Sequence, residues 1–154
     1  MDYVTVKWLH ILSSTFLFGT GIGSAWYMLF ANISRDVRAI AVVSKYVVIA
    51  DVVFTATTAI IQPLTGFYLI HLAGYPLHSR WIMWAIALYV LAGACWLAVV
   101  WLQMRLRDLA QEAVGTGAEL TPRYWHYFRI WVALGVPAFF AFVVIFWLMV
   151  AKPA

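Results

Sequence analysis

The chain has 154 residues, of which 66% are hydrophobic and only 10% are charged, and its net charge at pH 7 is +4. Soluble domains contain about 45–50% apolar and about 25% charged residues, so this composition excludes a soluble globular domain and indicates a protein surrounded by lipid. A positive charge this small and scattered predicts no nucleic acid partner and fits the basic loops of a membrane protein.

Four apolar segments are long enough to cross a bilayer, which requires about 20 mostly apolar residues in a helix. They cover about residues 4–30, 46–72, 81–104 and 124–151. The fold class predicted from them is all-α, a four-transmembrane-helix bundle, with residues 1–154 in a single integral membrane domain. The first segment is too long for the apolar region of a signal peptide, so we expect it to remain as a helix.

In the first segment, His10 lies about two turns inside the helix. At about 100° per residue, one face joins it to small and polar neighbours. They include Ser14, Leu17, Gly21, Ser24 and Met28. An ionisable side chain that points into a bundle is a functional candidate, and imidazole is a standard haem iron ligand. Small neighbours such as Ser14 and Gly21 would leave room for the macrocycle. The alternative is an interfacial histidine bonded to a neighbouring helix, and the residue alone does not decide between the two.

The second segment contains Asp51, the only acidic residue inside a span. A polar stripe runs from it along one face, formed by Asp51, Thr55, Thr58, Gln62 and Thr65. This stripe must face protein or water. We expect it to form hydrogen bonds between helices, with Asp51 in reach of Lys45 or Arg38, in preference to a proton path, a propionate partner or a substrate site.

Two more histidines, His71 and His78, flank the turn after the second segment, on the same side of the membrane as His10. Either could supply a second axial ligand, so His10 and His71 are the candidate metal ligands and His78 is a further candidate for cofactor binding. His71 lies about 200° around the helix from Asp51, nearly opposite the polar stripe. The alternative for each is a solvated interfacial histidine.

The connections are expected to be loops at residues 32–45, 73–80 and 105–123. The third helix is expected to continue for a turn or two beyond residue 104, until Gly115 and Gly117 break it. Thr121 followed by Pro122 predicts the start of the fourth helix, with the threonine as N-cap and the proline at the first helical position.

Basic residues are distributed unevenly between the two sides that this topology defines. The first and third connections and their flanks carry seven of the ten, namely Arg35, Arg38, Lys45, Arg105, Arg107, Arg123 and Arg129. The opposite side carries Lys7, Arg80 and Lys152. Because basic loops stay in the cytoplasm, this bias predicts that both termini face outward.

Several segments resemble the small bacterial haem-dependent protoporphyrinogen oxidase. The first helix of that family begins Lys-x-x-His and is similar to VKWLHILSSTFLFGTG here, and its Thr-Gly second helix is similar to QPLTGFYLI. Its third and fourth helices resemble RWIMWAIALYVLAG and FRIWVALGVPAFFAFVVIFWLMVAKPA. CopD-like four-helix membrane proteins share a similar first helix, and the whole chain looks still more like an uncharacterised family of predicted bacterial integral membrane proteins. The distinctive positions are His10, Thr65-Gly66, Pro137 and Lys152-Pro153.

The resemblance implies a four-helix protein that binds haem b with His10 as an iron ligand. Two departures separate the chain from the oxidase. The oxidase has a lysine in its third helix where residues 82–85 here read Ile-Met-Trp-Ala, and Asn-Glu before the fourth-helix proline where residues 134–136 read Leu-Gly-Val. Both departures argue against protoporphyrinogen oxidation by the same mechanism.

The leading functional hypothesis is therefore a b-type haem-binding redox or electron-transfer protein of the bacterial inner membrane. It would pass electrons between a quinone or redox partner protein and an outward-facing donor and, if an enzyme, would be a haem-dependent membrane oxidoreductase. The alternatives are a cofactor-free subunit that anchors or scaffolds a partner, and a small-solute carrier that uses the Asp51 stripe. A homo-oligomer is compatible with each. A CopD-like copper role is disfavoured because the methionines and histidines form no evident soft-ligand cluster.

Overall fold

The computed structural model describes residues 2–153, and the regular secondary structure in that range is helical. The elements in chain order are α1 (Tyr3–Ser34), α2 (Val37–Ala50), the π-helix η1 (Asp51–Thr55), α3 (Ala56–Ala73), α4 (Arg80–Thr116) and α5 (Pro122–Ala151). Because α2, η1 and α3 follow one another without a break, they form one rod from Val37 to Ala73. The described residues thus contain four helices long and apolar enough to cross a membrane, which confirms the predicted fold class.

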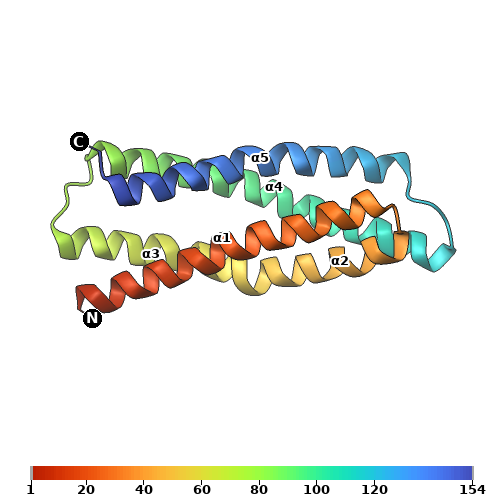
Figure 1. Ribbon diagram of the computed structural model, residues 1–154, viewed down its shortest axis with the longest axis horizontal. Coiled ribbons are helices and arrows are strands. Elements are labelled where there is room, and N and C mark those ends of the chain that lie inside the picture. The colour runs from red at the N-terminus through yellow and green to blue at the C-terminus, as the bar shows by residue number, and fades with distance from the viewer. Residues whose placement is uncertain (1, 154) are drawn as a thin grey trace.

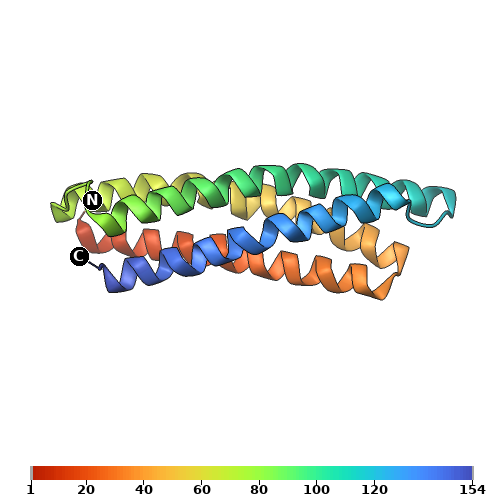
Figure 2. The same cartoon turned by 90° about the horizontal axis from the view of Figure 1, so that it is seen from above.

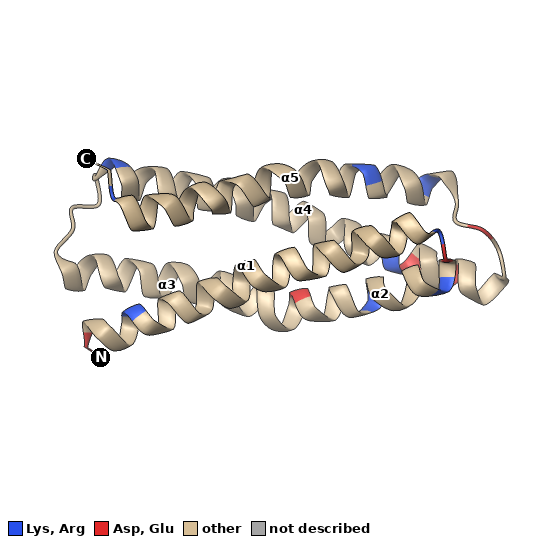
Figure 3. Cartoon of the chain, in the orientation of Figure 1, with Lys and Arg blue, Asp and Glu red and all other residues tan. Residues whose placement is uncertain are grey.

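The four rods run along the long axis of an elongated bundle (Figures 1 and 2). Both termini lie at the end that also carries the α3–α4 turn, and the α1–α2 junction and the α4–α5 loop lie at the opposite end. We call the first the terminal end and the second the basic end, because most lysines and arginines gather there (Figure 3). An even number of spans accounts for two termini on one side.

The expected loop at residues 32–45 is wrong, because only Arg35 and Asp36 separate α1 from α2. Arg35 adopts a left-handed conformation with φ 60° and its backbone N–H donates to the carbonyl of Asn32, which ends α1. The Asp36 carboxylate then accepts hydrogen bonds from the backbone N–H groups of Arg38 and Ala39 and starts α2 as its N-cap. Charged residues such as Arg38 therefore lie on the exposed surface of α2 and do not form a loop.

The start of the fourth span and the break of the third at Gly117 are confirmed, but α4 passes Gly115 and continues beyond residue 104 for more than the one or two turns expected. α4 continues to Thr116, about three turns past residue 104, before Gly117 ends it with a left-handed φ of 67°. Pro122 is the first residue of α5, and the Thr121 hydroxyl accepts a hydrogen bond from the backbone N–H of Tyr124.

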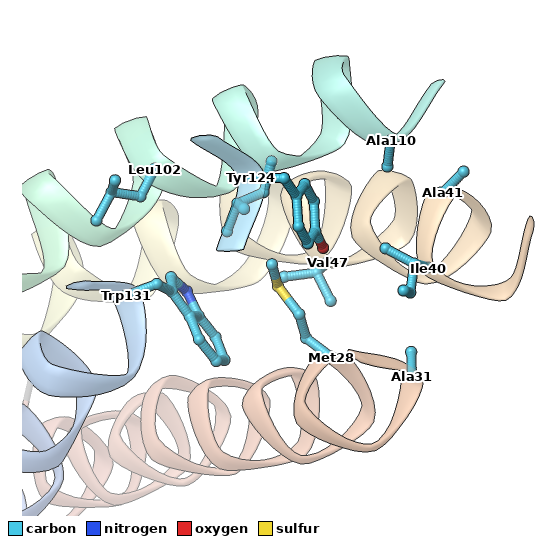
Figure 4. Packing of buried hydrophobic residues seen from close by; sticks show 10 residues of the cluster. Met28, Ala31, Ile40, Ala41, Val47, Leu102, Ala110, Tyr124 and Trp131 are labelled. Carbon is cyan, nitrogen blue, oxygen red and sulfur yellow. The ribbon is translucent and has the colours of Figure 1, made fainter. Parts of the chain in front are cut away.

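The main core lies in the half of the bundle nearer the basic end, where α1, α2, α4 and α5 meet (Figure 4). Its buried members are Met28, Ala31, Ile40, Ala41, Val47, Leu102, Leu106, Ala110, Tyr124 and Trp131. The fully buried Tyr124 donates its hydroxyl hydrogen to Oδ1 of Asn32 over 2.7 Å, which ties α5 to α1. A smaller cluster of Trp81, Ile82, Ala85 and Leu148 joins α4 to α5 near the terminal end.

A proline inside α3 is accommodated by a hydrogen bond from α4. Pro63 has no N–H, so the carbonyl of Ala59, four residues earlier, loses its helical donor. The Tyr89 hydroxyl donates to that carbonyl over 2.7 Å. A buried backbone acceptor in lipid must be satisfied by protein, so this bond removes the penalty of the proline and fixes α4 against α3.

Candidate functional site

The side chain of His10 is held between α1 and α3 through both ring nitrogens. Nδ1 lies 2.8 Å from Oγ1 of Thr65, and Nε2 lies 3.1 Å from Nε2 of Gln62. Thr65 and Gln62 belong to the polar stripe that the sequence shows on the second segment. The candidate histidine and the polar stripe, which sequence reasoning treated as separate features, therefore form one site, which we call the His10 site: His10, Gln62, Thr65 and Gly66.

The hydrogen bonds around His10 favour one tautomer. The Thr65 hydroxyl lies 2.8 Å from the carbonyl of Ile61 and 3.1 Å from that of Gln62, and when it donates its hydrogen to this side it accepts from His10. Nδ1 of His10 then carries the hydrogen, and Nε2 offers a lone pair that accepts from the amide of Gln62. A neutral imidazole with its hydrogen on Nδ1 is a form of histidine that can bind a metal through Nε2.

Gly66 allows the imidazole to approach the α3 backbone closely. A Cβ atom at this position would lie 3.2 Å from Cε1 and 3.8 Å from Nδ1 of His10, so any larger residue would push against the ring. This explains in physical terms why a Thr-Gly pair occurs here: the threonine supplies the acceptor for Nδ1 and the glycine supplies the space.

Two neighbours expected on the His10 face lie outside the His10 site. The Ser14 hydroxyl donates back to the carbonyl of Ile11 in its own helix over 2.7 Å. A Cβ on Gly21 would meet no atom within 4 Å. Ser13, one residue before Ser14, is the buried serine, and its hydroxyl donates to the carbonyl of Thr58 over 3.4 Å. The face of α1 that packs on α3 is thus rotated from the expected one.

The two candidate second ligands, His71 and His78, are both exposed. His71 follows Gly66 by five residues in regular helix, so it points about 140° away from the His10 side of α3. His78 lies in the turn between α3 and α4. Within residues 2–153, no three or more His, Cys, Asp or Glu side chains gather in a group that could hold a metal ion. The structure therefore brings neither histidine into the His10 site.

Of the three candidate histidines, His10 is the one whose surroundings resemble those of a metal-bound histidine. Metal-bound histidines commonly donate their other ring N–H to a nearby acceptor, which fixes the orientation of the ring, and Thr65 is that acceptor here. The group opposite Nε2 is the Gln62 amide, whose buried Oε1 has no hydrogen-bond partner. Gln62 is thus incompletely satisfied where it stands, and rotation of its flexible side chain would clear Nε2.

Asp51 forms a second polar cluster in the π-helix η1. It is 3% exposed, its Oδ1 accepts from the Thr55 hydroxyl over 2.9 Å, and the Gln103 side chain of α4 lies beside it. The expected contact with Lys45 or Arg38 is not formed, since both are exposed and the one ion pair among the described residues is Arg107–Asp108. Residues 51–55 contain no glycine or proline, so no sequence signal marked the π-helix.

Taken together, four helices long and apolar enough to cross a membrane and a histidine held between two of them define a polytopic helical membrane protein whose helices contact one another through internal polar side chains. The chain belongs to the family described as Predicted integral membrane protein (DUF2269), which matches residues 4–153. A comparison with curated proteins found no match, and a comparison with solved structures found none either.

Proposed function

We propose that this protein is a b-type haem-binding redox or electron-transfer protein of the bacterial inner membrane, with His10 as the iron ligand. The observation that carries the proposal is the orientation of His10: its Nδ1 lies 2.8 Å from the Thr65 hydroxyl oxygen and its Nε2 lies 3.1 Å from the amide nitrogen of Gln62, the side chain that a ligand would displace. The resemblance of the first two helices to the haem-dependent oxidase supports it, since His10 and Thr65-Gly66, three of the matching positions, meet in space.

Admitting a ligand at Nε2 requires Gln62 to move. This breaks the hydrogen bond to His10, which contributes about 1 kcal/mol net, and the displaced amide must find new partners or carry a penalty of about 1–3 kcal/mol. Thr65 continues to accept from Nδ1 and holds the ring in place. Haem bound there would supply one-electron transfer. The residues of this chain would bind the iron, orient the imidazole and exclude water from the site.

The basic end supports a proposed direction of insertion. Seven of the ten lysines and arginines lie there, so the positive-inside bias puts the basic end in the cytoplasm and the termini outside. The His10 site lies in the half of the bundle that this orientation places toward the outer leaflet. A quinone in the bilayer or a redox protein at the outer surface is the exchange partner that suits this position.

A second candidate function rests on the same histidine. Both ring nitrogens of His10 are already bonded within the chain, so the ring also serves as a clasp between α1 and α3 that requires no cofactor. In this reading the protein is a cofactor-free membrane subunit that anchors or scaffolds a partner.

Absorption spectra of the purified protein, produced with ample haem supply, separate the two functions. On the haem proposal the wild type shows a Soret band that shifts and sharpens on dithionite reduction, and His10→Ala loses it while remaining monodisperse. Gln62→Leu removes the amide that competes for Nε2 and should raise haem affinity several-fold. If His10 only holds α1 against α3, the same variant should bind no haem and should be less stable than the wild type. His71→Ala and His78→Ala are matched controls at exposed histidines and should retain the band. A colourless wild-type protein would end the haem proposal.

A further inference from the structure

An open groove of about 500 Å³ lies at the basic end, between the last turn of α1 and the first turns of α5. Its walls are formed by Asn32, Ile33, Arg35, Trp125, Phe128 and Arg129. It is distinct from the His10 site, which lies between α1 and α3 in the other half of the bundle. No residue of this groove takes part in the proposed redox function.

Two arginines border the groove without an acidic partner. The Arg35 guanidinium lies 4.1 Å from the centre of the Trp125 ring, and Nε of Arg129 donates to the carbonyl of Trp125 over 3.4 Å. Neither arginine forms an ion pair within residues 2–153. The nearest acid in sequence, Asp36, accepts hydrogen bonds from two backbone N–H groups as the N-cap of α2. The groove therefore presents two positive charges with spare hydrogen-bond donors.

The remaining walls are apolar or already saturated. Ile33 is 60% exposed, and Phe128 is half-buried beside it. Asn32 is buried, and its side chain already donates to the carbonyl of Met28 and accepts from the hydroxyl of Tyr124. A ligand for this groove must therefore combine an anionic group for the arginines with hydrocarbon for the isoleucine and phenylalanine.

An anionic phospholipid has this combination, and we propose that the groove binds one, with its phosphate between Arg35 and Arg129 and its first acyl methylenes against Ile33 and Phe128. Arginine pairs with phosphate through two parallel N–H···O bonds, and basic pockets between spanning helices suit anionic headgroups. The position supports this occupant, because the groove lies where α1 ends and α5 begins, at the rim of the bundle.

Native mass spectrometry of the detergent-purified protein tests the proposal. The probes are phosphatidylglycerol, phosphatidylcholine with the same acyl chains, and inorganic phosphate. The wild type should retain one phosphatidylglycerol and bind it at least tenfold more tightly than phosphatidylcholine. The double variant Arg35→Gln/Arg129→Gln should lose this preference, and inorganic phosphate should not displace the lipid.

The matched control is Arg38→Gln/Arg107→Gln, which removes the same charge from the same end outside the groove and should bind as the wild type does. Equal binding of the two lipids, or an unchanged preference in the groove variant, would overturn the proposal. Displacement by inorganic phosphate at comparable concentration would also overturn it, since the ligand would then be the free anion. Monodisperse elution of both double variants establishes that each is folded.

Discussion

Gly66→Ala tests whether the close approach of the His10 ring to the α3 backbone requires glycine at position 66. The new Cβ would lie 3.2 Å from Cε1 of His10, so the ring must retreat by a few tenths of an ångström. Two hydrogen bonds hold the ring, and retreat weakens the 2.8 Å bond from Nδ1 to Thr65. We expect this to cost about 1 kcal/mol, the net contribution of one such bond.

The opposing effect is the helix propensity of alanine, which exceeds that of glycine by up to about 1 kcal/mol in a helix interior. In the wild-type background the two effects nearly cancel. In a His10→Ala background the steric cost disappears and Gly66→Ala should stabilise the protein by up to about 1 kcal/mol. The predicted coupling between the two positions is therefore about 1 kcal/mol, within the range seen for contacting residues.

The assay is equilibrium unfolding in mixed micelles followed by circular dichroism, for the wild type, the two single variants and the double variant. Gly93→Ala on α4 is the matched control, because a Cβ there meets no atom within 4 Å and its effect should be equal in both backgrounds. If Gly66→Ala changes the free energy of unfolding equally with and without His10, the close approach does not constrain the ring and the reasoning fails.

Four further outcomes are expected. Tyr124→Phe should lower the free energy of unfolding by about 1–3 kcal/mol, because the buried Oδ1 of Asn32 loses its donor, and a chemical unfolding series measures this. Tyr89→Phe should lower the free energy of unfolding by a similar amount, because the Ala59 carbonyl loses its donor. Adding Pro63→Ala restores a helical N–H for that carbonyl, so recovery of the wild-type stability in the double variant would identify the carbonyl as the cause. Asp51→Asn should leave folding intact, since an amide can still accept from Thr55 and bonds between membrane helices average about 0.6 kcal/mol; retained stability with lost electron transfer would give Asp51 a functional role. A reporter active only outside the cell should work when fused after residue 153 and fail within residues 117–121, and the reverse pattern would refute the orientation.

The number and kind of spans could be predicted from composition, because apolar length alone decides what crosses a bilayer. The boundaries could not, since hydropathy reports the part of a helix that contacts lipid and not the part that is helical. α2 starts well before residue 46 because the Asp36 carboxylate caps it, and α4 passes residue 104 until Gly117 allows the left-handed turn. The helix ends at Thr121 and Gly117 could be predicted from the residue types alone. Asp36 is also a typical N-cap residue, but the charged residues around it made the segment resemble a loop.

The site could be predicted in its parts and not in its assembly. His10 stood out as an ionisable residue in an apolar helix, and Gln62 and Thr65 stood out on a polar stripe. Whether they meet depends on how α1 is rotated about its own axis when it packs on α3. A shift of one residue turns the packed face by about 100°, and the buried serine is Ser13 instead of the expected Ser14. Nothing in residues 51–55 indicated that the stripe would pass through a π-helix and divide into two clusters.

The length of the helices has a consequence for the shape of the protein in its membrane. The rod from Val37 to Ala73 and α4 each contain 37 residues, or about 56 Å at 1.5 Å per residue, against a hydrocarbon core of about 30 Å. Much of each rod must therefore stand in the headgroups and in water. The apolar stretch of α4 ends near residue 104, and its last three turns are rigid helix packed at the basic end through the buried Leu106 and Ala110. Charges on these turns keep fixed positions, so another molecule approaching this side would encounter a preformed array rather than a flexible loop.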